Sequence, residues 1–241
     1  MSVFERCLEK CRARKGVVVY SDGEDRRVVS AAAKLIREGL VEPILIGDPE
    51  KVRTALQESG ETGVSLQVVN PYNPALLQHN AAEYMAIQKA KGKDISEEEA
   101  VKAVKNPLAA GALMVRRGEA EIGVAGNLSS TADVIRAGLR MVGTAAGSKT
   151  VSSFFFMLKD NRVCMFTDCA VIPEPTSAQL ADIAISTADV YKRVMGDEAR
   201  VALLSFSTKG SAKHERVDKV RAALEEIKTR EPNLLVDGEL Q

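Results

Sequence analysis

The chain has 241 residues, of which 45% are apolar, so it can bury one large core or two smaller ones. Its 33 basic and 33 acidic side chains cancel, which leaves no net positive field to attract DNA, RNA or an anionic membrane. No stretch approaches the roughly 18 uninterrupted apolar residues of a membrane-spanning helix, and the charged N-terminus is unlike a secretory signal. These features predict a cytoplasmic protein with neither nucleic-acid nor membrane partners.

Residues that commonly bind metals are few and scattered. Cys7 and Cys11 lie four apart on one face of a predicted helix, but no second pair stands at ligand spacing. Neither His79 nor His214 belongs to a ligand pattern. The cysteines are interpreted as ordinary half-buried thiols, and no metal cofactor is expected.

Short apolar strands alternate with amphipathic helices from the start of the chain, a pattern typical of a parallel α/β sheet. The pattern predicts strands at 16–20, 42–47, 64–69 and 121–126. It predicts helices at 25–40, 74–92, 94–105, 107–120 and 127–143. Gly39 is a predicted C-cap, Ser96 a predicted N-cap, and Pro107 suits a first helical turn.

The composition changes at "AAGSKTVSS" (145–153), which is small and polar. We interpret it as the boundary between two α/β domains, 1–148 and 149–241. Beyond it, the sequence predicts a hairpin of strands 154–158 and 162–168 around "KDN", then a helix, a strand, a helix and a last strand, at 176–196, 200–205, 212–230 and 233–238. Thr176 and Gln179 fit a capping box.

Two loops stand where a predicted strand runs into a helix, the edge at which ligands bind in open α/β sheets. The loops "VAGNLSSTADV" and "SFSTKGSAKH" offer hydroxyl donors, backbone N–H groups, helix N-termini and one ammonium, from Ser129, Ser130, Thr131, Ser207, Thr208, Lys209, Gly210 and Ser211. Helix capping is the simpler explanation of a single such loop. Two loops, one of them with a lysine and a glycine, favour phosphate binding.

Arg136 and Arg140 lie four apart on one face of the helix after the first loop. They are either a guanidinium clamp for another phosphate or part of a solvated helix face. The segment "GTAAGSKT" (143–150) resembles a P-loop but has three residues between its glycines and Ser148 before its lysine. ATP or GTP binding there is therefore not expected.

Four motifs together resemble the phosphate acetyltransferase (phosphotransacetylase) family, and most closely its ethanolamine-utilisation type. They are "VAGNLSSTADVIRAGLR", "DCAVIPEPTSAQLADIAISTA", "VALLSFSTKGSAKH" and "VDGELQ". The similarity runs from "VYSDGEDRRVVSAAA" to the last residue. It implies two α/β domains with mainly parallel sheets, like those of isocitrate and isopropylmalate dehydrogenases, and an interdomain active-site cleft.

The resemblance also implies an activity, the exchange of an acetyl group between CoA and phosphate without a metal cofactor. The implied partners are acetyl-CoA, CoA, phosphate, acetyl phosphate and a second copy of the chain. Ser129–Thr131 and Ser207–Ser211 would then hold the phosphoryl group, with donors converging on it from both domains, and Arg136 would contact CoA. A bacterial microcompartment is an alternative to free cytoplasm.

The chain departs from the family pattern in two places. Gln88 stands where the family has another CoA-linked arginine, and Lys89 or Lys91 could replace it only as a point charge. Family members also continue well beyond "VDGELQ", into a segment that carries the proposed general base. No catalytic residue is therefore identified here, and this chain alone is expected to have little activity, because a general base contributes about 10²–10⁴ in rate.

Asp237 and Glu239 are interpreted as structural turn residues rather than as that base. Three alternative functions remain: a phosphate butyryltransferase, a catalytically inactive acetyl-CoA-binding regulatory module, and a generic nucleotide-binding protein. The relative turnover of acetyl- and butyryl-CoA, acetyl-CoA binding without turnover, and affinity for ATP would distinguish them.

Overall fold

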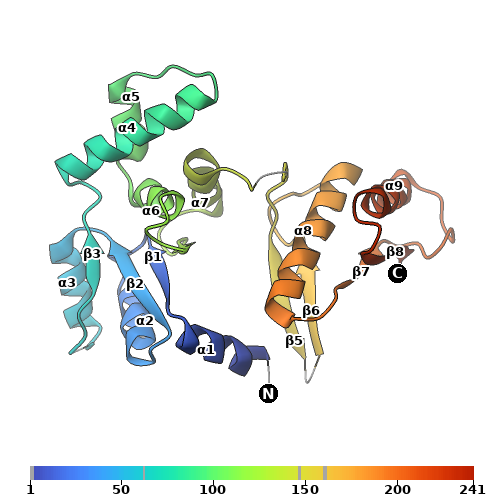
Figure 1. Cartoon of the computed structure of the whole chain (residues 1–241), viewed down its shortest axis with the longest axis horizontal. Coiled ribbons are helices and arrows are strands. Elements are labelled where there is room, and N and C mark those ends of the chain that lie inside the picture. The colour runs from blue at the N-terminus through green and yellow to red at the C-terminus, as the bar shows by residue number, and fades with distance from the viewer. Residues whose placement is uncertain (1–2, 62, 146–147, 160–161) are drawn as a thin grey trace. The chain divides into compact units, whose positions relative to one another are not determined.

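The computed structural model describes residues 3–61, 63–145, 148–159 and 162–241 (Figure 1). The chain divides into two compact units. The N-terminal unit is Leu8–Gly143, and the C-terminal unit is Thr144–Gln241 together with Met1–Cys7. The small polar stretch at 145–153 begins just after the division between Gly143 and Thr144. Its residues 146–147, which belong to the P-loop-like segment, lie outside the described residues.

The N-terminal unit is built on a parallel four-stranded sheet in the order β3-β2-β1-β4, of which Figure 1 labels β3, β2 and β1. Its strands are β1 (Gly16–Tyr20), β2 (Val41–Ile46), β3 (Gln67–Val69) and β4 (Ile122–Val124). All four strands were predicted, but β3 is shorter than expected because only Gln67–Val69 pair with β2. The chain winds outward from β1 to β3 and then returns to place β4 on the other side of β1. This reversal is the topological switch point at which open α/β sheets bind ligands.

Helices cover both faces of this sheet. On one face, Val18 and Tyr20 of β1 pack with apolar residues of α2 (Arg26–Arg37) and α3 (Pro49–Glu58). On the other, Val19 packs with Ala110 and Met114 of α6 (Pro107–Arg116). Successive side chains of a strand point to opposite faces, so one short apolar strand supplies both layers of the core.

Two more helices pack on α6. α4 (Pro74–Ala90) and α5 (Glu97–Val104) share an apolar cluster with α6, and the predicted N-cap Ser96 begins α5 through a complete capping box. α7 (Thr131–Ala137) continues directly into a π-helical turn, Gly138–Val142. α1 (Val3–Ala13) starts in the C-terminal unit, where Arg6 donates to the Met195 carbonyl (3.2 Å), and runs into the N-terminal unit.

The C-terminal unit contains an antiparallel and a parallel strand pair. β5 (Phe154–Lys159) and β6 (Arg162–Thr167) pair antiparallel as predicted, and residues 160–161 of the predicted turn "KDN" lie outside the described residues. β7 (Arg200–Leu204) runs parallel to β8 (Leu235–Leu240), and both pack against α8 (Ser177–Met195) and α9 (Glu215–Arg230) around a core that includes Leu203 and Ile227. The expected capping box of Thr176 and Gln179 begins α8.

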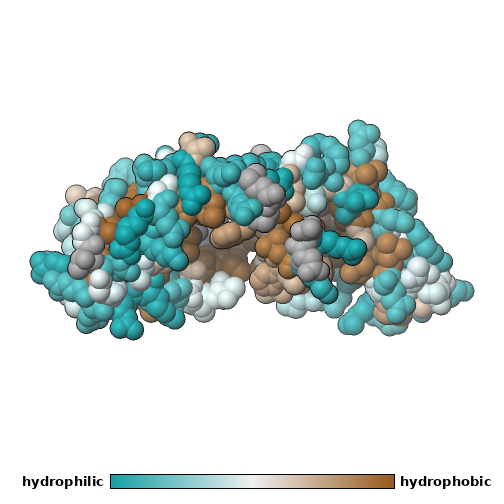
Figure 2. Space-filling view, turned by 90° about the horizontal axis from the view of Figure 1, so that it is seen from below, coloured by the Kyte–Doolittle hydropathy of each residue, from teal (hydrophilic) through white to brown (hydrophobic). Residues whose placement is uncertain are grey.

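Apolar side chains also remain on the surface. On the face in Figure 2, brown apolar residues interrupt a largely hydrophilic surface in both units. Several of the exposed apolar residues are on the hairpin: Phe154, Phe155, Met157, Leu158 and Phe166. None of the helices in the described part of the chain is both long and apolar enough to cross a membrane.

The turn after β1 fits tightly against β2 at Gly23. A Cβ at position 23 would lie 2.7 Å from the Ile46 carbonyl oxygen and 2.9 Å from the Leu45 Cβ, and neither can move without disturbing the sheet. We expect Gly23→Ala to lower the free energy of unfolding by about 1–3 kcal/mol. Urea denaturation followed by circular dichroism measures this change.

Gly138→Ala is the matched control. A Cβ at Gly138 meets nothing within 4 Å, and the residue has helical backbone angles, so this variant should be unchanged or more stable by about 0.4–1 kcal/mol. Equal stability of the two alanine variants would show that the backbone at Gly23 can shift to accept a Cβ. The tight contact with β2 would then not contribute to stability.

Candidate functional site

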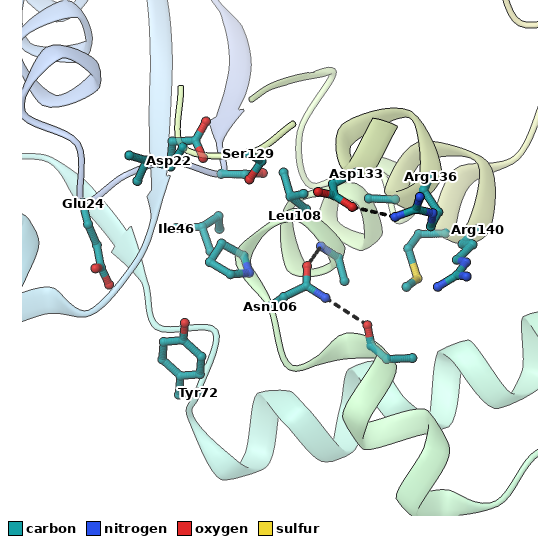
Figure 3. Close-up of a pocket in the computed structure, with 17 residues that line it drawn as sticks. Asp22, Glu24, Ile46, Tyr72, Asn106, Leu108, Ser129, Asp133, Arg136 and Arg140 are labelled. Carbon is teal, nitrogen blue, oxygen red and sulfur yellow. Dashed lines mark hydrogen bonds and ion pairs between the residues drawn. The ribbon is translucent and has the colours of Figure 1, made fainter. Parts of the chain in front are cut away.

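A pocket of about 460 Å³ lies at the switch point of the N-terminal sheet (Figure 3). Every strand contributes at its carboxyl end: Ser21 and Asp22 follow β1, Ile46 ends β2, Tyr72 follows β3, and Ser129 follows β4. The start of α6 and one face of α7 close the other sides. This is the position at which the topology predicts a ligand.

Asp22 fixes the loop after β4. Its carboxylate, in a residue only 6% exposed, accepts hydrogen bonds from the backbone N–H of Gly126 (2.7 Å) and of Asn127 (2.8 Å). Gly126 has a φ of 116°, a conformation that a residue with a Cβ rarely adopts. The side chain of Asp22 therefore holds the first predicted phosphate loop in place, a role that the sequence analysis missed.

The three hydroxyl residues of this first loop have different surroundings. Ser129 lines the pocket, and Thr131 is an exposed residue at the start of α7. Ser130 is the N-cap of α7: its hydroxyl accepts from the Asp133 N–H (3.2 Å) and donates to the Asp133 carboxylate (2.7 Å). The capping explanation thus applies to Ser130, whereas Ser129 faces the cavity.

Arg136 and Arg140 lie on the pocket side of α7 and the π-helical turn, at the opposite end from Glu24 and Tyr72 (Figure 3). Arg136 donates to the Asp133 carboxylate (2.6 Å). The Ser130 hydroxyl and, after it, the Arg136 charge hold the pKa of Asp133 below its usual value. Arg140 forms no ion pair or side-chain hydrogen bond with any residue that the structure describes, so its guanidinium is available to an anionic ligand.

An apolar wall also lines the pocket. Leu108 and Ala109 of α6 contribute to it, together with Leu128 and Ile46. Asn106 at the start of α6 is already occupied, because it accepts from the Ala109 N–H (2.8 Å) and donates to the Ala103 carbonyl (3.0 Å). Apolar walls with a few convergent polar groups are typical of pockets for organic ligands, and the arginines favour one that carries phosphate.

The second predicted phosphate loop follows β7 in the C-terminal unit, and its residues point in two directions. Ser207 is fully buried, and its hydroxyl donates to the Glu239 carboxylate (2.9 Å). The Gly210 N–H donates to the same carboxylate (2.7 Å). Thr208, Lys209, Gly210 and Ser211 are exposed residues, so they are the part of the loop that a ligand can reach.

The Lys209 side chain extends from the loop toward the end of β8. Its ammonium donates to the Asp237 carboxylate and to the Gly238 carbonyl (3.2 Å) while its side chain stays 54% exposed. The Lys209 ammonium and, after it, the Gly238 N–H hold the pKa of Asp237 below its usual value. The ammonium is therefore ordered by β8 and still open to solvent on one side.

The other residues considered in the sequence analysis lie outside the pocket and the two loops or have a structural role. Gln88 is buried in α4, whereas Lys89 and Lys91 are exposed. His214 is the N-cap of α9 and accepts from the Arg216 N–H (3.1 Å). The four cysteines are free thiols, and the described residues contain no cluster of three side chains suited to a metal ion.

Comparison with known proteins identifies the family. Residues 2–241 match the model described as "Phosphate acetyl/butaryl transferase". The chain belongs to this family. It is 38% identical to the phosphate acetyltransferase of Thermoanaerobacterium thermosaccharolyticum, over 100% of its own length and 74% of that protein.

Solved structures agree with this assignment. The phosphotransacetylase from Streptococcus pyogenes matches with a TM-score of 0.91 at 36% identity, over 99% of this chain and 72% of that one. The EutD phosphotransacetylase from Staphylococcus aureus matches with a TM-score of 0.88 at 32% identity, over the same two shares, 99% and 72%. The predicted family, α/β fold and phosphate acetyltransferase function are thereby confirmed, and the EutD structure supports the ethanolamine-utilisation branch.

Proposed function

We propose that the two loops and Arg136 bind the substrates of this acetyl transfer. Ser129–Thr131 and Ser207–Ser211 serve the phosphoryl group, Ser207 and Gly210 by holding the loop that carries the other donors, and Arg136 serves CoA. The observation that carries the proposal is the exposed stretch Thr208–Ser211, where a hydroxyl, an ammonium and another hydroxyl follow a strand of a family member. Such donors hold the oxygens of a small dianion.

The chemistry gives these donors a role in the transition state. In the direction of acetyl-CoA formation, the CoA thiolate attacks the carbonyl carbon of acetyl phosphate, and the carbon–oxygen bond to phosphate breaks. Negative charge then grows on the departing phosphate, where Lys209 and the hydroxyls of Thr208 and Ser211 stabilise it. These residues bind and orient, and none of them is assigned as the base that takes the thiol proton.

The pocket at the switch point supports the CoA assignment. Arg136 and Arg140 at one end offer guanidinium groups to phosphates, while the apolar wall of Leu108 and Leu128 suits the organic part of the molecule. CoA is a substrate in this reaction rather than a resident cofactor, and we propose no metal.

We also propose the domain division 1–148 and 149–241, a homodimer, and a cytoplasmic location with a bacterial microcompartment as the alternative. The exposed apolar side chains on β5 and β6 support association with a second copy. The balance of 33 basic and 33 acidic residues supports a protein without nucleic-acid or membrane partners.

A comparison of acyl donors tests the proposed function. The protein is incubated with CoA and either acetyl phosphate or butyryl phosphate, and thioester formation is followed by ultraviolet absorbance. We expect faster transfer from acetyl phosphate. Faster transfer from butyryl phosphate would instead indicate a phosphate butyryltransferase. Because little activity of this chain alone is expected in any case, the ratio of the two rates decides between these functions.

A further inference from the structure

A buried carboxylate lies beneath the second loop. Glu239 is only 2% exposed and sits at the end of β8, next to the loop after β7. Its side chain accepts from the Ser207 hydroxyl (2.9 Å) and the Gly210 N–H (2.7 Å). Arg221 of α9 supplies two more donors, through Nε (2.8 Å) and Nη2 (2.9 Å). The carboxylate is thus hydrogen-bonded on both oxygens.

These bonds fix the path of the loop. Lys209 has a φ of 47° and Gly210 a φ of 90°, so the backbone turns through the left-handed region between Ser207 and Ser211. The Lys209 N–H donates to the Glu239 carbonyl (3.1 Å), which adds a main-chain bond to those made by the side chain. A lysine in this conformation is uncommon, so neighbouring contacts must hold it there.

The same bonds decide which donors a ligand can use. Ser207 and the Gly210 N–H are turned inward, toward Glu239, and cannot also bind a substrate without losing that contact. Thr208, Lys209 and Ser211 are exposed residues, although the Ser211 hydroxyl also accepts from the Thr208 N–H (3.0 Å) and lies 3.3 Å from the Ser207 hydroxyl. Glu239 therefore binds some donors of the loop and leaves the exposed residues for a ligand.

Arg221 compensates the negative charge of Glu239. A negative charge directly behind a phosphate-binding loop would repel the phosphate, but the Arg221 guanidinium pairs with Glu239 through two hydrogen bonds. Arg221 and, after it, the Gly210 N–H keep the pKa of Glu239 well below its usual range. Both side chains are therefore charged, and the net charge of the pair is close to zero.

We propose that Glu239 and Arg221 are a positioning pair that holds residues 207–211 in the conformation needed to bind phosphate. The proposal rests on the proposed function, in which this loop binds the phosphoryl group. Glu239 acts through the loop and does not touch the substrate. Its removal should consequently loosen the loop and weaken phosphate binding together.

Glu239→Gln tests the proposal. The amide keeps the size of the side chain but has one acceptor oxygen and places an NH₂ group against donors of Ser207, Gly210 or Arg221. We expect hydrogen exchange at the Gly210 amide to become at least tenfold faster, and the affinity for inorganic phosphate, measured by calorimetry, to fall about tenfold. Glu198→Gln is the matched control, because it removes an exposed carboxylate paired with Lys192 in the same unit and should change neither quantity.

Lys209→Met separates this proposal from the proposed function. If Lys209→Met weakens phosphate binding but Glu239→Gln leaves both phosphate affinity and Gly210 exchange at the wild-type values, the positioning role is wrong and the phosphate loop stands. If Lys209→Met has no effect on phosphate affinity, the proposed function of the loop fails and the positioning role fails with it.

Arg221→Gln covers the case in which Glu239→Gln does not fold. Arg221 lies on the partly exposed side of α9, and its replacement leaves Ser207, Gly210 and Glu239 in contact while removing the compensating charge. We expect the affinity for inorganic phosphate to fall about tenfold, because the buried Glu239 carboxylate beneath the loop is left without its opposite charge. An unchanged phosphate affinity in folded Arg221→Gln would overturn the proposal.

Discussion

Replacing Lys209 with methionine is expected to weaken phosphate binding by about 10- to 100-fold. Charge-assisted hydrogen bonds contribute about 1.5–3 kcal/mol, which corresponds to this range of affinities. The Lys209 side chain is 54% exposed and keeps one side open to solvent, so it can reach a ligand without moving the backbone. Methionine retains most of the aliphatic stem, so the variant removes the charge and little else.

The measurement is a calorimetric titration with inorganic phosphate, together with the KM for phosphate in acetyl transfer from acetyl-CoA. CoA affinity should stay at the wild-type value, because the pocket lined by Arg136 and Arg140 belongs to the N-terminal unit. Lys192→Met is the control, since that lysine also pairs with an exposed carboxylate, of Glu198, in the same unit.

Asp237→Asn tests the Lys209 charge in the opposite direction, because it removes the carboxylate that pairs with the Lys209 ammonium. Asp237 competes with phosphate for the Lys209 ammonium, so its neutralisation should leave phosphate affinity unchanged or raise it. If Asp237→Asn weakened phosphate binding as much as Lys209→Met, the ion pair would be important for the shape of the loop, and direct contact between Lys209 and phosphate would be the wrong explanation.

The strands and most helices could be predicted from the sequence because their signals are local. Periodic apolar residues, the capping boxes at Ser96 and Thr176, and Pro107 at a helix start all act within a few residues of one another. The helix α3 was missed, although Asp48 and Pro49 begin it, because it is short and buries only Val52 and Ala55. A weak apolar stripe gives little periodic signal.

The carboxylates that hold the loops could not be predicted in this way. Asp22 binds residues 126 and 127, and Glu239 binds residues 207 and 210. Asp168 similarly accepts from the N–H groups of Ser153 and Ile172, both at 2.7 Å. Most of these contacts join residues that are far apart in the chain, and only strand order brings them together. The sequence indicated which loops carry donors but not that some donors serve internal carboxylates.

The two arginines of the pocket should bind CoA unequally. Arg136 already pairs with Asp133, an exposed i,i+3 pair, and must share its guanidinium to bind a ligand phosphate. Arg140, with no such pair among the described residues, loses nothing by binding. We expect Arg136→Ala to weaken CoA binding about threefold to tenfold, and the Arg136→Ala, Arg140→Ala double variant about 100-fold.

Calorimetry with CoA and with pantetheine separates phosphate recognition from general damage to the pocket. Pantetheine carries the thiol arm without any phosphate, so its affinity should be the same in wild type and in both variants. Arg53→Ala is the matched control, because Arg53 forms an equivalent exposed i,i+3 pair with Glu50 on α3, away from the pocket.

The salt dependence gives the arginine assignment a second, independent readout. Charges that bind an exposed phosphate are screened, since the Debye length falls from about 10 Å at 0.1 M salt to about 3 Å at 1 M. Wild-type affinity for CoA should therefore fall steeply with salt, and the double variant should respond much less. Equal losses for CoA and pantetheine, or the same salt slope in wild type and double variant, would mean that Arg136 and Arg140 shape the pocket wall without contacting a phosphate.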